Sequence, residues 1–127
     1  MQADEVRALV AQYFDCANND DFEGLAKLFH EDAVSRPVNA PPLVGRDAVL
    51  TMYPQVLAPF PVHCDDPVRI LVSGQTAAVN IHFTGTMTDG KVIEFDAVDV
   101  IEYEDGLIRR ISYWYDEAAI IADMTSP

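Results

Sequence analysis

The chain has little that could staple a fold together or anchor it in a membrane. Two cysteines, Cys16 and Cys64, stand among 127 residues, and a chain of this length can bury its own core without a disulfide scaffold. No apolar run approaches the ~18 residues that a membrane span needs. The first ten residues carry acids where a secretory signal has a basic region. We therefore expect a cytoplasmic protein without a membrane partner.

Basic residues are also scarce. Eight Lys and Arg stand against 21 Asp and Glu, which gives a formal net charge of −13. Such a charge repels phosphate backbones, so we expect no nucleic-acid partner. Glycine-rich phosphate loops and hydrolase motifs are absent, and His30, His63 and His82 lack the spacing of metal ligands. We expect neither a metal nor a cofactor.

What the sequence does contain is hydrophobic periodicity of two kinds. A helical period predicts a helix over 4–18, a short helix capped by Asp20 or Asp21, and a third helix after Gly45 that Pro54 should kink or shorten. From residue 62 the period becomes two, and turn signals separate the segments. The predicted strands cover 32–38, 68–72, 77–86, 91–103 and 107–115. This pattern is typical of one α+β domain, 1–127, in which three helices pack on a strongly curved, mostly antiparallel sheet around one open pocket.

Asp99 is the main anomaly in this pattern. On the strand 94–103 it shares one face with apolar side chains only: Phe95, Ala97, Ile101 and Tyr103. A buried carboxyl group has to be paired or protonated. Asp99 is therefore a candidate functional residue. An outward-facing row, with Val98 and Val100 inside, and an internal ion pair are the alternatives.

Several short stretches in a consistent order resemble the steroid Δ5-isomerases, or ketosteroid isomerases, and the related SnoaL-like proteins. They are Ala11–Phe14, Val34–Gly45, Met52–Tyr53, Phe95–Val100 and Ser112–Trp114. The resemblance covers nearly the whole chain. It implies a nuclear-transport-factor-2-like (cystatin-like) conical barrel whose pocket binds a hydrophobic, carbonyl-containing small molecule.

The resemblance also implies roles for individual residues. Tyr13 and a protonated Asp99 would donate hydrogen bonds to the substrate oxygen, and Tyr53 would support Tyr13. The expected pocket lining includes Ala17, Tyr53, Val62, Ala97 and Trp114.

One position departs from the family pattern. Arg36, just before Pro37, stands where the family has the Asp that shuttles the proton, and a guanidinium cannot act as a base. Arg36 would either enter the pocket as a third donor or point to solvent. Asp65, Asp66 or Asp116 could replace the base only if its side chain enters the pocket. We expect Asp65 and Asp66, which precede Pro67, in a solvated turn.

Three functions stay open at this point. The chain could be an enzyme acting on a carbonyl compound, as an isomerase, a polyketide cyclase or an epoxide hydrolase. It could instead be a small-molecule carrier that performs no chemistry, or a protein-interaction domain. In each case we expect a homodimer formed through the outer face of the sheet.

Overall fold

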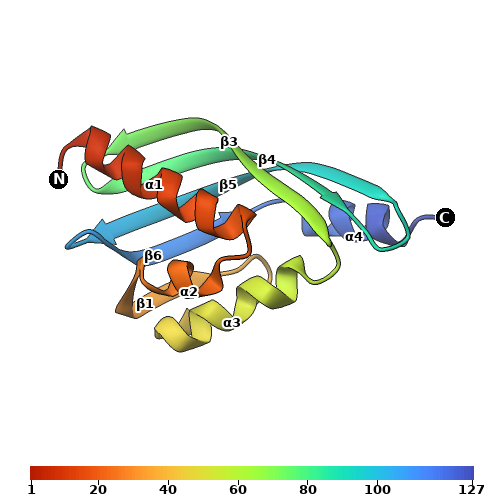
Figure 1. The fold of residues 1–127 in the computed structure, drawn as a ribbon, viewed down its shortest axis with the longest axis horizontal. Coiled ribbons are helices and arrows are strands. Elements are labelled where there is room, and N and C mark those ends of the chain that lie inside the picture. Colours follow the sequence, from red (N-terminus) through yellow and green to blue (C-terminus); the bar gives the residue numbers. More distant parts are fainter.

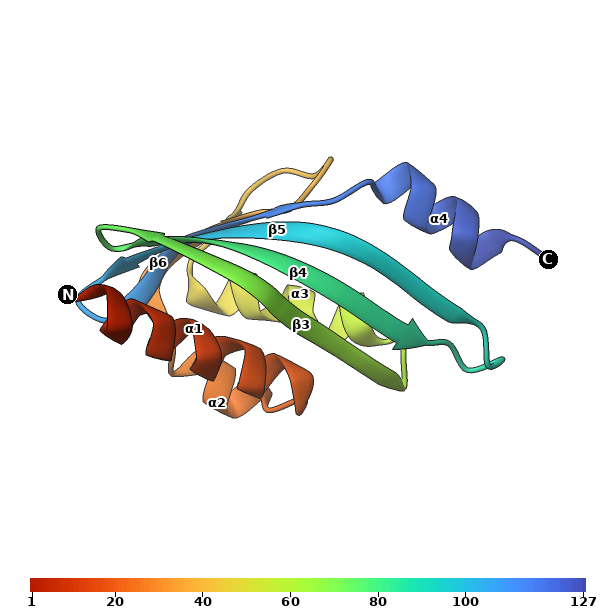
Figure 2. The same cartoon turned by 90° about the horizontal axis from the view of Figure 1, so that it is seen from above.

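Three helices cover one face of a curved sheet, and a fourth helix extends beyond one end of the sheet (Figures 1 and 2). The computed structural model describes residues 1–127. The helices are α1 (Ala3–Asn18), α2 (Phe22–Ala26), α3 (Arg46–Leu57) and α4 (Glu117–Thr125). The strands are β1 (Phe29–Arg36), β2 (Leu43–Val44), β3 (Val62–Ser73), β4 (Thr76–Thr86), β5 (Val92–Glu104) and β6 (Leu107–Trp114). The α+β prediction is confirmed.

The six strands form one sheet in the order β2-β1-β6-β5-β4-β3. β1 and β6 run parallel, and every other neighbouring pair is antiparallel. The turn between β5 and β6 forms at Asp105 and Gly106, whose φ angles of 54° and 77° suit a tight hairpin turn. Strands β3 to β6 therefore form the antiparallel meander that the sequence predicts.

The core lies between the concave face of the sheet and helices α1 to α3. The side chains of Leu25, Phe29, Ile101, Ile108 and Ile111 are almost completely buried there. The Asp21 carboxylate caps α2 by accepting the backbone N–H of Gly24 at 2.9 Å. No helix has both the length and the apolar character needed to cross a membrane.

α3 runs through Pro54 and ends three residues later, at Leu57, because Tyr53 and Leu57 pack against the domain and tertiary contacts offset the local cost of proline. One sequence prediction about the elements is wrong: β3 begins at Val62, so Asp65 and Asp66 lie in a strand rather than a turn. α4 was not predicted; it buries no residue completely, which leaves no clear apolar stripe to detect.

Candidate active site

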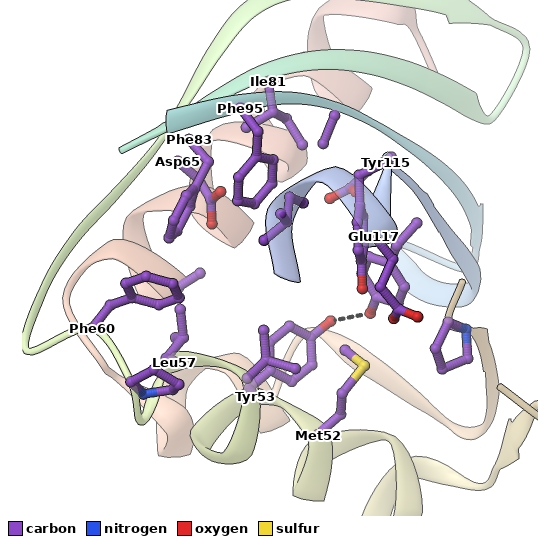
Figure 3. A pocket seen from close by; sticks show the side chains of 18 of the residues that line it. Met52, Tyr53, Leu57, Phe60, Asp65, Ile81, Phe83, Phe95, Tyr115 and Glu117 are labelled. Carbon is purple, nitrogen blue, oxygen red and sulfur yellow. Dashed lines mark hydrogen bonds between the residues drawn. The ribbon is translucent and has the colours of Figure 1, made fainter. Parts of the chain in front are cut away.

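A cavity of about 260 Å³ lies between the concave sheet face and helices α1, α3 and α4. Sixteen of its 21 lining residues are hydrophobic, so the few polar groups on its wall stand out as candidates for chemistry. Figure 3 shows side chains from these elements surrounding the central space, with Asp65 and Glu117 among the rings. The lining residues Val56 and Ile121 are about half exposed and mark the opening to solvent.

Three tyrosine hydroxyls form a chain in the wall. Tyr53 shares one hydrogen bond with Tyr13 at 3.0 Å and another with Tyr113 at 2.5 Å (Figure 3 shows the second). Burial first, and the neighbouring hydroxyls after it, raise the pKa of Tyr13 and of Tyr113, so both stay protonated. Three hydroxyl protons serve two hydrogen bonds, so one proton is left over. It lies on the residue of Tyr13 and Tyr113 that accepts from Tyr53, or on Tyr53 itself when Tyr53 accepts both bonds.

Asp99 lies opposite Tyr113 in the register of β5 and β6 and faces the same cavity. Its side chain belongs to the concave face, as strand alternation predicts, and the residue is 6% exposed. Burial, and secondly the charge of Asp65, raises the pKa of Asp99 well above its usual range, with no hydrogen bond acting against the shift. The Asp99 carboxyl group is therefore held in its neutral, proton-donating form.

Asp65 supplies a second carboxyl group to the same cavity. It lies on β3 beside Phe83 of β4, and its side chain points toward the central space (Figure 3). Burial raises the pKa of Asp65 to about 6, although the nearby His63 lowers it to a smaller extent. At neutral pH this carboxyl group is ionised. The two acids thus differ in protonation within one cavity.

Asn18 holds Asp65 in place. β3 is an edge strand, so the outward backbone groups of Asp65 have no neighbouring strand. The Asn18 Nδ2 donates to the Asp65 carbonyl at 2.9 Å, and the Asn18 Oδ1 accepts the Asp65 backbone N–H at 2.8 Å. Because Asn18 ends α1, this pair of hydrogen bonds ties the helix that carries Tyr13 to the strand that carries Asp65.

The structure brings together most of the residues that the sequence analysis placed in the pocket. Lining residues from this set are Tyr13, Ala17, Tyr53, Ala97 and Asp99. Val62 and Trp114 do not line the cavity, which corrects the expected lining. Strand alternation explains both cases, because inward-facing His63 and Tyr113 force their neighbours outward. Val62 is 67% exposed and Trp114 is 57% exposed.

Arg36 also lies outside the cavity. It pairs with Ser112 in the parallel register of β1 and β6, and Ser112 shares the outer face of the sheet with Trp114. Arg36 is exposed and lines a separate surface hollow with Trp114. Of the two alternatives for Arg36, the structure has the one in which its side chain points to solvent and not into the pocket as a third donor. Of the carboxylates considered as replacements for the base, Asp65 lines the cavity, whereas Asp66 and Asp116 do not.

Sequence reasoning missed two polar members of the wall. Tyr113 was hidden by the expectation for Trp114, although the alternation of Ile111, Tyr113 and Tyr115 carried the signal. Glu117 was missed together with α4. No group of three or more His, Cys, Asp or Glu side chains is placed to hold a metal ion.

Comparison with known proteins agrees with this fold. Residues 10–111 match the family model described as a SnoaL-like domain. The chain belongs to the SnoaL-like family. A putative SnoaL-like polyketide cyclase from Jannaschia sp. CCS1 superimposes with a TM-score of 0.89 at 16% identity, covering 97% of this chain and 93% of that one. This SnoaL-like chain therefore has the nuclear-transport-factor-2-like fold that the sequence predicts.

Two further solved structures are similar. A putative ketosteroid isomerase from Kribbella flavida is 27% identical, with a TM-score of 0.74 over 90% of this chain and 79% of that one. IdmH, a putative polyketide cyclase from Streptomyces antibioticus, is 21% identical, with a TM-score of 0.81 over 95% and 99% of the two chains. The fold is thus shared by proteins whose described activities differ.

The hydroxyl chain yields a first prediction. We expect Tyr13→Phe to weaken binding of a phenolic probe such as 2-naphthol by about 1–3 kcal/mol, because a buried hydrogen bond to the ligand is lost. Tyr113→Phe should weaken binding less. When Tyr13 donates to the ligand, the Tyr113 hydroxyl donates its proton to Tyr53 and not to the ligand. Calorimetric titration measures both. Tyr103→Phe is the control, because the Tyr103 hydroxyl is buried, unpartnered and outside the cavity. If Tyr113→Phe weakens binding more than Tyr13→Phe does, the ligand donor is Tyr113.

A second prediction concerns stability and pH. The pKa of Asp65 is about 6 in the folded state, above the value near 3.9 of an unfolded chain. Protonated Asp65 therefore contributes its full stabilisation to the folded state below pH ~4, and this contribution is lost as the pH rises through ~6. Asp65→Asn should exceed wild type in stability by about 3 kcal/mol at pH 7, and the difference should vanish near pH 4. Urea denaturation across this range measures it, with exposed Asp66→Asn as control. A difference independent of pH would contradict the shift.

Proposed function

We propose that this SnoaL-like protein is an enzyme that moves a proton at a carbon next to a carbonyl group in a hydrophobic small molecule. The observation that carries the proposal is the pair of carboxyl groups in one apolar cavity: Asp65, which is ionised at neutral pH, and Asp99, which is kept protonated. Titratable groups whose surroundings push their pKa values apart are typical of acid–base catalysis.

The proposed step balances within these residues. The Asp65 carboxylate takes the proton from the carbon, and the C–H electron pair moves into the carbonyl group to form an enolate. Asp99 and the free hydroxyl of the tyrosine chain donate hydrogen bonds to the enolate oxygen. Protonated Asp65 then returns the proton to another carbon in an isomerisation. In a cyclisation the enolate carbon attacks a second carbonyl carbon, the C=O electron pair moves onto its oxygen, and that oxygen takes the proton back from Asp65. Both outcomes begin with the same enolate.

The surroundings of Asp65 suit the role of a base. A base works best when its pKa lies near the working pH, and a pKa of about 6 leaves Asp65 mostly ionised at pH 7 and still basic. A cavity of about 260 Å³ is slightly smaller than the ~300–1,000 Å³ usual for small-molecule sites. We therefore expect a compact substrate, or the reacting end of a larger one.

Deuterium exchange tests the proposal without knowledge of the natural substrate. Hydrophobic carbonyl compounds, including 2-tetralone and a 5-ene-3-ketosteroid, are incubated with the protein in D2O, and loss of the α-proton signal is followed by NMR. Exchange above the buffer rate for at least one compound is expected. If compounds bind and none exchanges faster than in buffer, the cavity binds without catalysis, and the carrier function replaces this proposal.

We also propose a homodimer formed through the outer face of the sheet. A shallow hollow on this face is lined by Val68, Val98 and Trp114, and the Trp114 side chain is more than half exposed. Exposed apolar surface of this kind is typical of an interface. Sedimentation equilibrium at micromolar concentration should show dimers, and Trp114→Asp should weaken dimerisation by about 30-fold or more, as for a central interface residue. A wild-type protein that is monomeric throughout would contradict the proposal.

A further inference from the structure

The cavity wall carries acidic groups and no basic side chain. Three carboxyl groups line it, those of Asp65, Asp99 and Glu117, whereas Lys, Arg and His are absent from all 21 lining residues. The nearby His63, which lowers the pKa of Asp65 to a small extent, lies outside the lining and contacts Asp20 at 2.7 Å. The lining itself therefore offers Asp65 no basic partner. A carboxylate in apolar surroundings is costly until a cation is placed beside it.

A second observation points to a ligand. Asp99 is 6% exposed, its side chain faces the cavity, and no protein group forms a hydrogen bond with it. Its oxygens are open to the cavity, where a bound molecule can supply the hydrogen-bond partner that the protein does not. Asp99 reaches the cavity from β5 and Asp65 from β3, with β4 between them, so a ligand would contact each of them with a different part of its structure.

Aromatic rings form the outer part of the same cavity. Phe83 stacks on Phe95 with ring centroids 4.7 Å apart, and Phe60 and Tyr115 extend this cluster at 5.1 and 5.9 Å. Strand register places Asp65 beside Phe83, and Phe83 beside Phe95. The ring cluster therefore lies next to the ionised acid. Ring faces attract organic cations, and most strongly where water is excluded.

Glu117 approaches the cluster from the other side. It is the first residue of α4, and its Oε1 accepts a hydrogen bond from Asn39 Nδ2 at 3.4 Å. Figure 3 shows its carboxylate beside Tyr115, at the edge of the space that the rings surround. The rings thus stand between two carboxylates, Asp65 and Glu117.

We propose that the ligand of this cavity carries a positively charged nitrogen, and that this ammonium group lies among Phe83, Phe95 and Tyr115, between Asp65 and Glu117. The inference rests on the proposed function in taking this cavity as the substrate site and in placing the carbonyl end toward Tyr13 and Asp99. The substrate class is then a hydrophobic amino ketone. Its positive charge would stabilise the enolate, because both charges lie in a medium of low polarity. Anionic substrates are disfavoured by the same acidic wall.

Two molecules of equal shape test the inference. Benzyltrimethylammonium carries a permanent charge, and neopentylbenzene is the same molecule with carbon in place of nitrogen. Calorimetric titration of the wild-type protein at pH 7.5 should show the cation binding about 10–100-fold tighter than the neutral molecule, as expected for ring contacts combined with a nearby carboxylate. Equal affinities, tighter binding of neopentylbenzene, or no binding of the cation at millimolar concentration would overturn the inference.

Variants locate the cation. Phe95→Leu keeps an apolar wall but removes one ring face, so the ratio of the two affinities should fall by about 2–30-fold. Glu117→Gln should also lower the ratio, and the exposed outer-face change Asp96→Asn should leave it unchanged. A ratio that Phe95→Leu and Glu117→Gln both leave unchanged would overturn the proposed position.

The probes do not react, so this result is separate from the catalytic proposal. Preference for the cation without deuterium exchange on any ketone would retain the ligand class and end the proposed reaction. Deuterium exchange without preference for the cation would retain the proposed reaction and end the proposed ligand class.

Discussion

Asp65→Asn is expected to lower the rate of α-proton exchange by about 10²–10⁴-fold, the usual contribution of a general base. Asparagine keeps the size of the side chain and its place on β3 but cannot accept a proton from carbon. Binding of an unreactive ketone should change much less than the rate, because the rest of the wall is intact. NMR exchange rates at saturating ketone measure the effect.

The matched control is Asp66→Asn, which makes the same chemical change on the exposed face of the same strand. Its exchange rate should equal that of wild type. The wild-type rate should rise with pH through about 6 and then level off, since Asp65 acts only when ionised. A rate that Asp65→Asn leaves intact would assign the base elsewhere on the wall, with Glu117 the next candidate.

The second large effect is expected at Asp99. Replacement by leucine removes the proton donor and should lower the exchange rate by about 10²–10³-fold, as for loss of one donor to an enolate oxygen. Replacement by asparagine should cost far less, because its amide still donates a hydrogen bond and is neutral, like the protonated acid. The contrast between the two variants therefore reports the protonation state of Asp99.

A control for the Asp99 variants is again available on the same strand. Asp96→Asn changes an exposed acid on the outer face of β5 and should leave the rate unchanged. If Asp99→Asn is as slow as Asp99→Leu, the carboxyl group has a role that a neutral donor cannot fill. The assignment of Asp99 as a neutral acid would then be withdrawn.

Local sequence rules predicted that Tyr13 and Asp99 line the cavity, because their positions follow from helical and strand periodicity. The period of two placed Asp99 on an apolar face, and the helical period placed Tyr13 on the buried stripe of α1. The same alternation, applied to β6, would have directed Tyr113 inward and Trp114 outward.

The position of the proposed base, Asp65, could not be predicted in the same way. Asp65 lies in an edge strand, ahead of Pro67, where the sequence suggests a turn. Its backbone is held there by Asn18, a contact between residues 47 positions apart that no local pattern reveals. α4, which supplies Glu117, buries no residue completely and so carried little signal. The resemblance directed attention to Arg36, which strand register places on the outer face of the sheet.

The central claim is that two carboxyl groups of one cavity hold different protonation states at neutral pH. Titration of protein labelled with ¹³C at the aspartate carboxyl carbons measures this directly, with Asp65→Asn and Asp99→Asn assigning the two signals. We predict one carboxyl group with a midpoint near pH 6 whose signal is lost in Asp65→Asn, and one that is still protonated at pH 7 and lost in Asp99→Asn. Two carboxyl groups that are both ionised at pH 5 would contradict the account.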